Sequence, residues 1–213
     1  STIVRVGMDD IKAEGDSGLL VGEKWRLVDI IDFTLTTSSN DGASAIATVA
    51  GSFGQSEFGF PTQEAKNDFV QKMNMKTQEI GLVDTYFLNE SGLDINEELS
   101  GSYGTAKEIS LLMTYAIKNK INIFEATSRD RFSLSSLDKI GHIATNTNKS
   151  VKNIPGLIAS KTGFTDLAGG NLVIAFDAGI MRPIIISVLG SSIDGRFEDV
   201  EKLVWAVLEK LDM

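Results

Sequence analysis

The chain has 213 residues, of which 42% are hydrophobic, and a formal net charge of −9 with an isoelectric point near 4.7. This size and composition are typical of a globular protein with a substantial core and argue against disorder. The negative charge disfavours a nucleic-acid partner, because scattered Lys and Arg residues would not neutralise phosphates. No cysteine and a single histidine leave no disulfide, thiolate or histidine-rich metal site, so we expect no metal and no cofactor.

The first part of the chain is predicted to be mainly helical. In chain order, the predicted elements are a strand over 1–6, a loop over 10–24, and helices over 25–35, 40–49 and 62–80. Two of these helices follow from apolar residues spaced three and four apart, and the 40–49 helix from its small residues. Thr105 and Glu108 form a capping box that predicts the start of another helix.

The last third is predicted to be mainly extended. Its elements are a hairpin over 132–145, strands over 157–162, 171–177 and 183–191, and a helix over 198–211. Ala178-Gly179 predicts the turn between the last two strands. We therefore expect an α/β (α+β) fold in one domain over 1–213, with a helical part over about 25–125. The antiparallel sheet and C-terminal helix would occupy about 130–213.

The triplet Lys161-Thr162-Gly163 follows an apolar strand. A glycine beside a lysine on an edge strand lets a ligand backbone approach, because no Cβ obstructs it. The Lys161 ammonium and the Thr162 hydroxyl could then hold an anionic group or tune a neighbouring hydroxyl. The alternative is an exposed strand lysine followed by a turn, which composition alone favours.

The triplet Ser38-Ser39-Asn40 precedes a predicted helix. Ser38 and Asn40 are favoured at a helix N-cap because their side chains satisfy free backbone N–H groups, and this is the alternative to a functional role. The two triplets together, in this order and roughly 120 residues apart, favour a shared active site.

Further segments match one family in its order: 38–47, 75–87, 91–94, 105–109, 170–173, 188–191 and 195–196. On these segments the chain resembles the serine D-alanyl-D-alanine carboxypeptidases, the low-molecular-weight penicillin-binding proteins of the penicillin-recognising serine hydrolases. The resemblance implies a β-lactamase/transpeptidase-like fold, an antiparallel sheet with flanking helices and a helical subdomain.

The resemblance also implies catalytic roles. Lys161 would face Ser38 and Asn40 across the cleft. Ser38 would relay a proton to the leaving D-alanine, and Asn40 would hydrogen-bond the substrate peptide and the catalytic lysine. These expectations make Ser38, Asn40 and Lys161 the candidate catalytic residues.

The resemblance further implies substrate-binding roles for Thr162, Gly163, Phe164 and Arg196. Thr162 and Arg196 would bind the terminal carboxylate, for which the guanidinium is a fixed, charged donor fork. The backbone N–H of Phe164 would supply one arm of the oxyanion hole, typically worth about 3 kcal/mol of barrier. The alternative for Arg196 is a surface arginine paired with a nearby carboxylate in the same helix.

The nucleophilic Ser-x-x-Lys that the family carries upstream of Ser-x-Asn does not occur before Ser38. The spelling occurs once, at Ser136-Leu-Asp-Lys139, in a strand or loop context, and we interpret it as a coincidence. We therefore expect that the family's first strands and nucleophile helix are missing. Removing a central helix leaves a cavity, so self-association or pairing with the missing N-terminal segment is expected.

The favoured function is a serine-type D-Ala-D-Ala carboxypeptidase that acts on peptidoglycan stem peptides through an acyl-enzyme and binds β-lactam antibiotics. We expect this chain alone to be inactive because the nucleophile is absent. A degenerate peptide-binding module and a β-lactamase relative are the alternatives. The resemblance implies a location in the bacterial cell envelope as an exported protein, periplasmic or extracytoplasmic, with or without a membrane anchor in the full-length protein.

Overall fold

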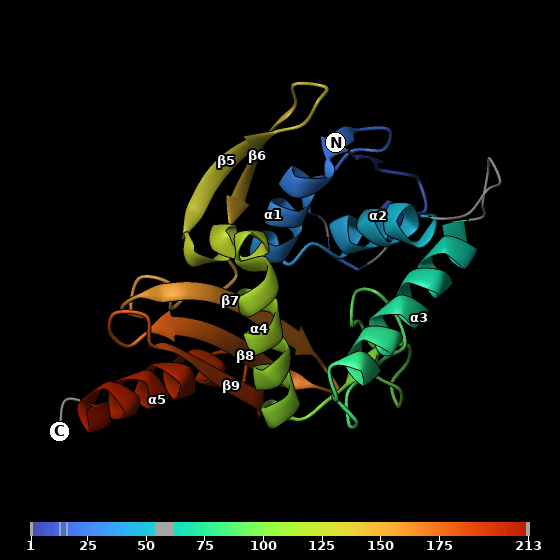
Figure 1. Ribbon diagram of the computed structural model, residues 1–213. Coiled ribbons are helices and arrows are strands. Elements are labelled where there is room, and N and C mark those ends of the chain that lie inside the picture. The colour runs from blue at the N-terminus through green and yellow to red at the C-terminus, as the bar shows by residue number, and fades with distance from the viewer. Residues whose placement is uncertain (1, 13, 16, 54–61, 212–213) are drawn as a thin grey trace.

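The computed structural model describes residues 2–12, 14–15, 17–53 and 62–211 (Figure 1). Its helices are α1 (Leu27–Thr37), α2 (Asn40–Gly51), α3 (Thr62–Glu79), α4 (Ala106–Lys120) and α5 (Gly195–Leu211), with 3-10 turns η1 (Asp10–Lys12), η2 (Ile121–Ile123) and η3 (Glu125–Ser128). Its strands are β1 (Ile3–Arg5), β2 (Lys24–Arg26), β3 (Tyr86–Phe87), β4 (Ser102–Tyr103), β5 (Arg131–Ser135), β6 (Gly141–Thr145), β7 (Leu157–Thr165), β8 (Gly169–Asp177) and β9 (Pro183–Ser191). Helices combined with antiparallel strands confirm the predicted α+β class.

The last third of the chain forms a three-stranded antiparallel sheet in the order β7-β8-β9. Successive side chains of a strand point to opposite faces. Leu172, Ile174 and Phe176 of β8 pack with α5 in one apolar cluster. Ala175, which alternates with them, packs with Met113 of α4 in another. The sheet therefore lies between α4 and α5, as Figure 1 shows.

The two clusters on the faces of the sheet form one core of the molecule. A second core lies around Trp25, which is fully buried in β2. Its ring centroid lies 5.7 Å from that of Phe33 in α1 and 5.0 Å from that of His142 in β6. Ala144 of β6 belongs to the same cluster. Because Trp25 takes part in the β1–β2 pairing, the helix predicted to begin there begins two residues later, at Leu27.

The helical and sheet-bearing stretches of sequence are interleaved in space. The β5–β6 hairpin lies with α1 and the N-terminal strands, at the end of the molecule away from the three-stranded sheet (Figure 1). α4 precedes this hairpin in the chain and yet covers one face of the sheet. The sequence predicted that a helical part ends and a sheet-bearing part begins near 125–130. This division does not coincide with the boundary between the two cores.

The predicted capping box at the start of α4 is half formed. Thr105 Oγ1 accepts a hydrogen bond from the Glu108 N–H at 3.2 Å, as an N-cap should. The buried Glu108 carboxylate turns instead to the preceding loop, where it accepts from Thr85 Oγ1 at 2.5 Å and from the Asp84 N–H at 3.1 Å. These bonds fix the start of the loop between α3 and α4.

Glu23 lies beneath the β5–β6 hairpin with a fully enclosed side chain. Its Oε1 lies 2.7 Å from His142 Nε2, and its Oε2 accepts a hydrogen bond from the Leu20 N–H at 3.1 Å. Burial alone would raise the pKa of Glu23, but the hydrogen bonds, led by that from Leu20, outweigh burial and lower it. A lowered pKa means that this carboxylate stabilises the fold above about pH 4.5 and that the contribution is lost as the pH falls further.

Replacing Glu23 with glutamine is expected to lower the urea midpoint at pH 7 and to lower it progressively less below pH 4.5. The reason is that acid protonates the native carboxylate and removes the advantage it has over an amide. Urea titrations of both chains from pH 7 to pH 3 measure this difference. The matched control is Glu209→Gln, at an exposed position of α5. The prediction is contradicted if the urea midpoints of the unchanged chain and the Glu23→Gln variant differ by the same amount at every pH.

Candidate active site

Ser38 lies at the junction of α1 and α2. It ends α1 in the left-handed region, with φ 57° and ψ 44°. Ser39, not Ser38, is the N-cap of α2: its Oγ accepts from the Gly42 N–H at 2.9 Å. A left-handed serine costs free energy, and such residues gather at functional sites. The capping alternative for Ser38 is therefore wrong, and its hydroxyl is available to the cleft.

Close packing of α1 on α2 holds this junction in place. A Cβ added at Gly42 would lie 2.1 Å from Thr34 Oγ1, so only glycine permits this approach of the two helices. Thr34 Oγ1 is buried and has no hydrogen-bond partner among the described residues. The glycine thus sets how closely α1 and α2 approach at the junction that carries Ser38.

Asn40 is the first residue of α2 and lines the same cleft. Its Nδ2 donates a hydrogen bond to the Glu14 carbonyl at 2.7 Å. This bond holds the loop before β2 against the start of α2. The predicted hydrogen bond from Asn40 to the lysine is not among the side-chain bonds found in the described residues, so its contact with a substrate stays a prediction.

Lys161 lies in the middle of β7, opposite Val173 of β8. The strand continues four residues beyond it, to Thr165. Its Nζ lies 2.6 Å from Ser38 Oγ and 2.6 Å from the carbonyl oxygen of Thr162. Ser38 and Lys161 are 123 residues apart in sequence, and the structure brings them into direct contact.

The environment of Lys161 makes its amine easier to deprotonate. Burial, and to a smaller degree the positive charge of Arg196, lower its pKa from 10.5 to about 8. Near neutral pH a minority of such amines is neutral, and a neutral amine can accept the Ser38 hydroxyl proton. The contact therefore places the Ser38 hydroxyl at hydrogen-bond distance from an amine whose pKa is lowered.

Arg196, near the start of α5, is buried and turned toward the cleft. Its Nη1 donates to the carbonyl oxygen of Gly163 in β7, while its Nε has no partner among the described residues. The alternative of a surface arginine is wrong, because the side chain is only 8% exposed. Burial lowers the pKa of Arg196, although the nearby Asp194 carboxylate raises it.

The other predicted binding residues follow Lys161 along β7. Thr162 is buried, and its hydroxyl lies 2.6 Å from that of Thr147. Gly163 lies opposite Asn171, and an added Cβ would meet only ordinary contacts there, so the chain's own packing does not require glycine. The Phe164 side chain is 45% exposed. All three residues line the cleft.

The cleft encloses about 930 Å³ and is lined from three directions. The Ser38 junction forms one side and β7 with Arg196 forms another. The loop between α3 and α4, including Leu93 and Tyr103, forms the third. The volume is that of a site for a small molecule or a peptide end. The structure thus brings together all seven residues that the sequence predicted: Ser38, Asn40, Lys161, Thr162, Gly163, Phe164 and Arg196.

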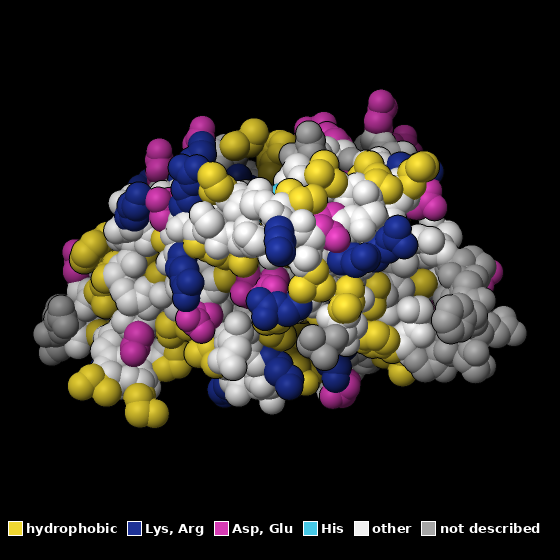
Figure 2. Space-filling model, turned by 90° about the horizontal axis from the view of Figure 1, so that it is seen from above, with side chains coloured by type: hydrophobic (Ala, Val, Ile, Leu, Met, Phe, Trp, Pro, Cys, Tyr) yellow, Lys and Arg dark blue, Asp and Glu magenta, His cyan; other side chains and the backbone are white. Residues whose placement is uncertain are grey.

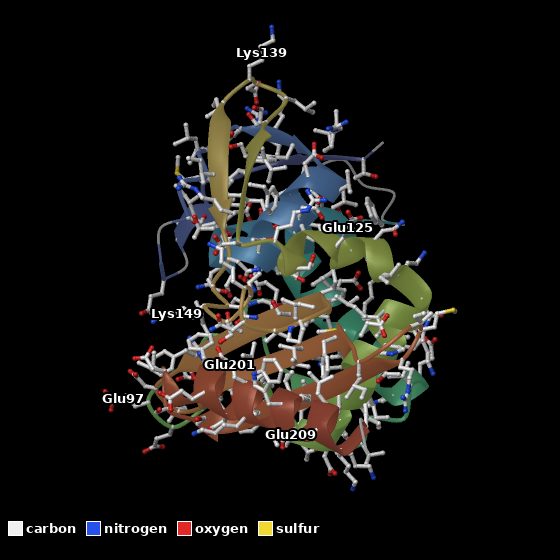
Figure 3. The ribbon with its side chains drawn as sticks, turned by 90° about the vertical axis from the view of Figure 1, so that its left-hand side faces the viewer. Glu97, Glu125, Lys139, Lys149, Glu201 and Glu209 are labelled. Carbon is white, nitrogen blue, oxygen red and sulfur yellow. The ribbon has the colours of Figure 1, made fainter. Side chains whose placement is uncertain are left out.

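The Ser136-x-x-Lys139 sequence lies elsewhere. It forms the turn of the β5–β6 hairpin, where the Ser136 hydroxyl accepts from the Ile140 N–H at 3.3 Å. Lys139 points outward at the tip of the hairpin, far from the sheet that carries the cleft (Figure 3). Neither residue lines the cleft. This position away from the cleft agrees with the interpretation that the Ser-x-x-Lys motif at 136–139 is a coincidence.

Thr147 and Tyr103 are among the cleft residues that the sequence did not predict. Thr147 contacts the Thr162 hydroxyl from the loop after β6, and Tyr103 lines the cleft from β4. The only signal for Thr147 is its place between Asn146 and Asn148, residues typical of tight loops. Its side-chain contact depends on how the hairpin packs, which a local pattern does not encode.

Among the described residues, no group of three or more acidic or histidine side chains could hold a metal ion. None of the described helices is both long and apolar enough to cross a bilayer. On the face that Figure 2 shows, Lys and Arg side chains are interspersed with Asp and Glu.

A family model described as D-alanyl-D-alanine carboxypeptidase matches residues 1–192. Among curated proteins, the chain is 31% identical to D-alanyl-D-alanine carboxypeptidase DacF of Bacillus subtilis over 173 residues, covering 80% of this chain and 39% of DacF. It is 29% identical to DacA of Escherichia coli over 167 residues, covering 78% of this chain and 36% of DacA. The chain therefore spans less than half the length of these relatives.

Solved structures show the same architecture. The Streptomyces K15 DD-transpeptidase superposes with a TM-score of 0.77 at 25% identity, covering 94% of this chain and 76% of that one. A D-alanyl-D-alanine carboxypeptidase from Mycobacterium tuberculosis superposes with a TM-score of 0.72 at 24% identity, covering 88% and 65% respectively, a likeness of fold alone. These likenesses confirm the predicted transpeptidase-like fold.

Proposed function

The chain belongs to the D-alanyl-D-alanine carboxypeptidase family, and from this premise we propose that its cleft binds the D-alanyl-D-alanine end of peptidoglycan stem peptides for hydrolysis through an acyl-enzyme. The observation that carries the proposal is the 2.6 Å contact between Lys161 Nζ and Ser38 Oγ. Two groups that far apart in sequence meet in a cleft of suitable size, and one of them has a pKa lowered to about 8.

Ser38 and Lys161 together would carry the proton of the reaction. The neutral amine of Lys161 accepts the Ser38 proton, and Ser38 takes the proton that the attacking hydroxyl releases and passes it to the departing D-alanine nitrogen. The Lys161 ammonium then returns its proton to Ser38, which restores both groups. This route supplies a proton to the leaving group without a histidine. Asn40, at the start of α2, would hydrogen-bond the substrate peptide from the same side of the cleft.

The substrate's free carboxylate would lie between Thr162 and Arg196. A guanidinium and a hydroxyl both donate to carboxylate oxygens, and the enclosed position strengthens such bonds. The bond from Arg196 Nη1 to the Gly163 carbonyl holds the guanidinium against β7, beside the position proposed for the carboxylate. Gly163 would let the substrate backbone approach β7, and the Phe164 N–H would donate to the developing oxyanion.

We propose that residues 1–213 do not form the acyl-enzyme by themselves. The reason is that their single Ser-x-x-Lys lies in a hairpin turn away from the cleft. The cleft would then complete its catalytic set with a segment outside residues 1–213. The substrate and β-lactams would both be bound here, and the site of action would be the bacterial cell envelope, where peptidoglycan lies.

A peptide-binding module without catalysis is the second candidate. It is favoured by the same position of Ser136-x-x-Lys139 together with a cleft whose recognition residues are in place. Both candidates require the cleft to bind a D-alanyl-D-alanine end. They differ in whether any serine of the natural protein becomes acylated.

A fluorescent penicillin distinguishes the two candidates. Residues 1–213 are expected to give no covalent band, whereas the protein extended upstream in its natural reading frame is expected to label at a serine outside residues 1–213. Peptide mapping identifies the serine, and Ser136→Ala serves as the control that must not change labelling. A covalent adduct at any serine of residues 1–213 contradicts the proposal, and an unlabelled extended protein that still binds the peptide supports the module.

A further inference from the structure

We infer that Thr147 is a positioning residue that gives the cleft its preference for ligands ending in a free carboxylate. The inference deepens the proposed function and rests on it. Thr147 Oγ1 lies 2.6 Å from Thr162 Oγ1, and both residues line the cleft. Either hydroxyl could be the donor in this contact.

The ligand's charge decides which hydroxyl donates. Each hydroxyl has a single hydrogen, and only one hydrogen can lie between the two oxygens. A carboxylate in the cleft accepts hydrogen bonds and cannot donate, so Thr162 must turn its hydrogen toward the ligand. The hydrogen between the two threonines then belongs to Thr147, which makes a chain from Thr147 through Thr162 to the carboxylate.

Such a chain favours an anion over a neutral amide. Each bond in a row of hydrogen bonds polarises the next, so a donor behind Thr162 makes its hydroxyl a better donor to an anion. Arg196, which the proposed function places beside the same carboxylate, lines the cleft as well. A C-terminal amide presents N–H groups as well as an oxygen, so it gains less from a donor that is already oriented.

The loop that carries Thr147 is built to hold it still. The Thr147 N–H donates to the Thr36 carbonyl of α1 at 3.2 Å. Asn146 Nδ2 donates to the Thr127 carbonyl at 2.8 Å, and the Asn148 N–H donates to Asn146 Oδ1 at 2.9 Å. Asn148 is itself buried. A hydroxyl held this firmly keeps Thr162 oriented before a ligand arrives.

The test compares two ligands on residues 1–213: a peptide ending in D-alanyl-D-alanine and the same peptide with a C-terminal amide. Thr147→Val keeps the shape of the side chain and removes its hydroxyl. We expect it to weaken binding of the acid about 3- to 10-fold and to leave the amide within about 2-fold. Thr147→Ser restores the hydroxyl and is expected to bind the acid within about 2-fold of the unchanged chain.

A double-mutant cycle separates positioning from a general structural role. If Thr147 acts through Thr162, Thr147→Val has no further effect in a Thr162→Val chain. Thr145→Val, at the exposed end of β6, is the matched control. It is expected to leave the affinities for the acid and for the amide unchanged. Calorimetric titration measures all affinities, and thermal unfolding checks that every variant is folded.

The outcomes are distinct. If the unchanged chain binds the acid no better than the amide, the proposed function fails and the inference fails with it. If the unchanged chain prefers the acid and Thr147→Val keeps that preference in full, or weakens both ligands equally, only the inference is overturned.

Discussion

Replacing Lys161 with methionine is expected to stabilise the folded chain at neutral pH and to remove the rise in its stability with pH. Above pH 8 the native lysine is largely deprotonated, whereas the unfolded chain keeps the proton until about pH 10.5, so stability rises across this interval. Since one pH unit is worth about 1.4 kcal/mol, the rise is at most about 3.5 kcal/mol. Methionine fills a similar volume without a charge to bury. Denaturant titrations from pH 7 to pH 10 measure the effect.

The same substitution is expected to remove function. In a protein that carries the nucleophile, Lys161→Met should slow acylation by penicillin at least about 100-fold, because the amine that handles the proton is gone. Lys118→Met, on the exposed end of α4, is the matched control and should change neither stability profile nor labelling. A Lys161→Met chain that keeps the stability rise between pH 8 and 10, or that labels at the unchanged rate, contradicts the assignment.

Replacing Arg196 with glutamine is expected to weaken binding of a D-alanyl-D-alanine acid by about 30- to 100-fold, the loss of charge-assisted hydrogen bonds in an enclosed site. The amide form of the peptide is expected to lose much less affinity. Because the positive charge of Arg196 helps to lower the pKa of Lys161, the variant should also move the midpoint of the Lys161-dependent stability rise above about pH 8.

The control for Arg196 is Arg182→Gln, which lies in the β8–β9 turn and should change neither affinity nor the midpoint. Calorimetric titration gives the affinities, and the denaturant series gives the midpoint. Equal losses for acid and amide would mean that Arg196 holds the cleft open rather than binding the carboxylate. An unchanged midpoint would mean that its charge does not reach Lys161.

Several costly features meet at this cleft. Ser38 adopts a left-handed backbone, Lys161 has a pKa lowered by burial, and the buried Nε of Arg196 lacks a partner in the described part of the chain. Each of these destabilises the folded state, and none contributes to the two apolar cores. Such features are expected to occur together at a site that is optimised for binding a ligand rather than for stability.

The sequence determined the elements whose causes are local. The strands of the last third and α5 formed where apolar spacing predicted them, because burial on one face requires that spacing. The capping residue Thr105 was predicted because a capping bond spans three residues. The two triplets and the order of the matching segments indicated the family without coordinates.

The tertiary structure decided what depends on contacts between distant residues. It moved Trp25 from the predicted helix into β2, because the side chain fills a core made by the hairpin that follows a hundred residues later. It made Ser39 the cap and left the Ser38 hydroxyl to contact Lys161, since helix packing at Gly42 sets that junction. It also brought Thr147 to Thr162, a contact between loop and strand for which sequence spacing has no rule.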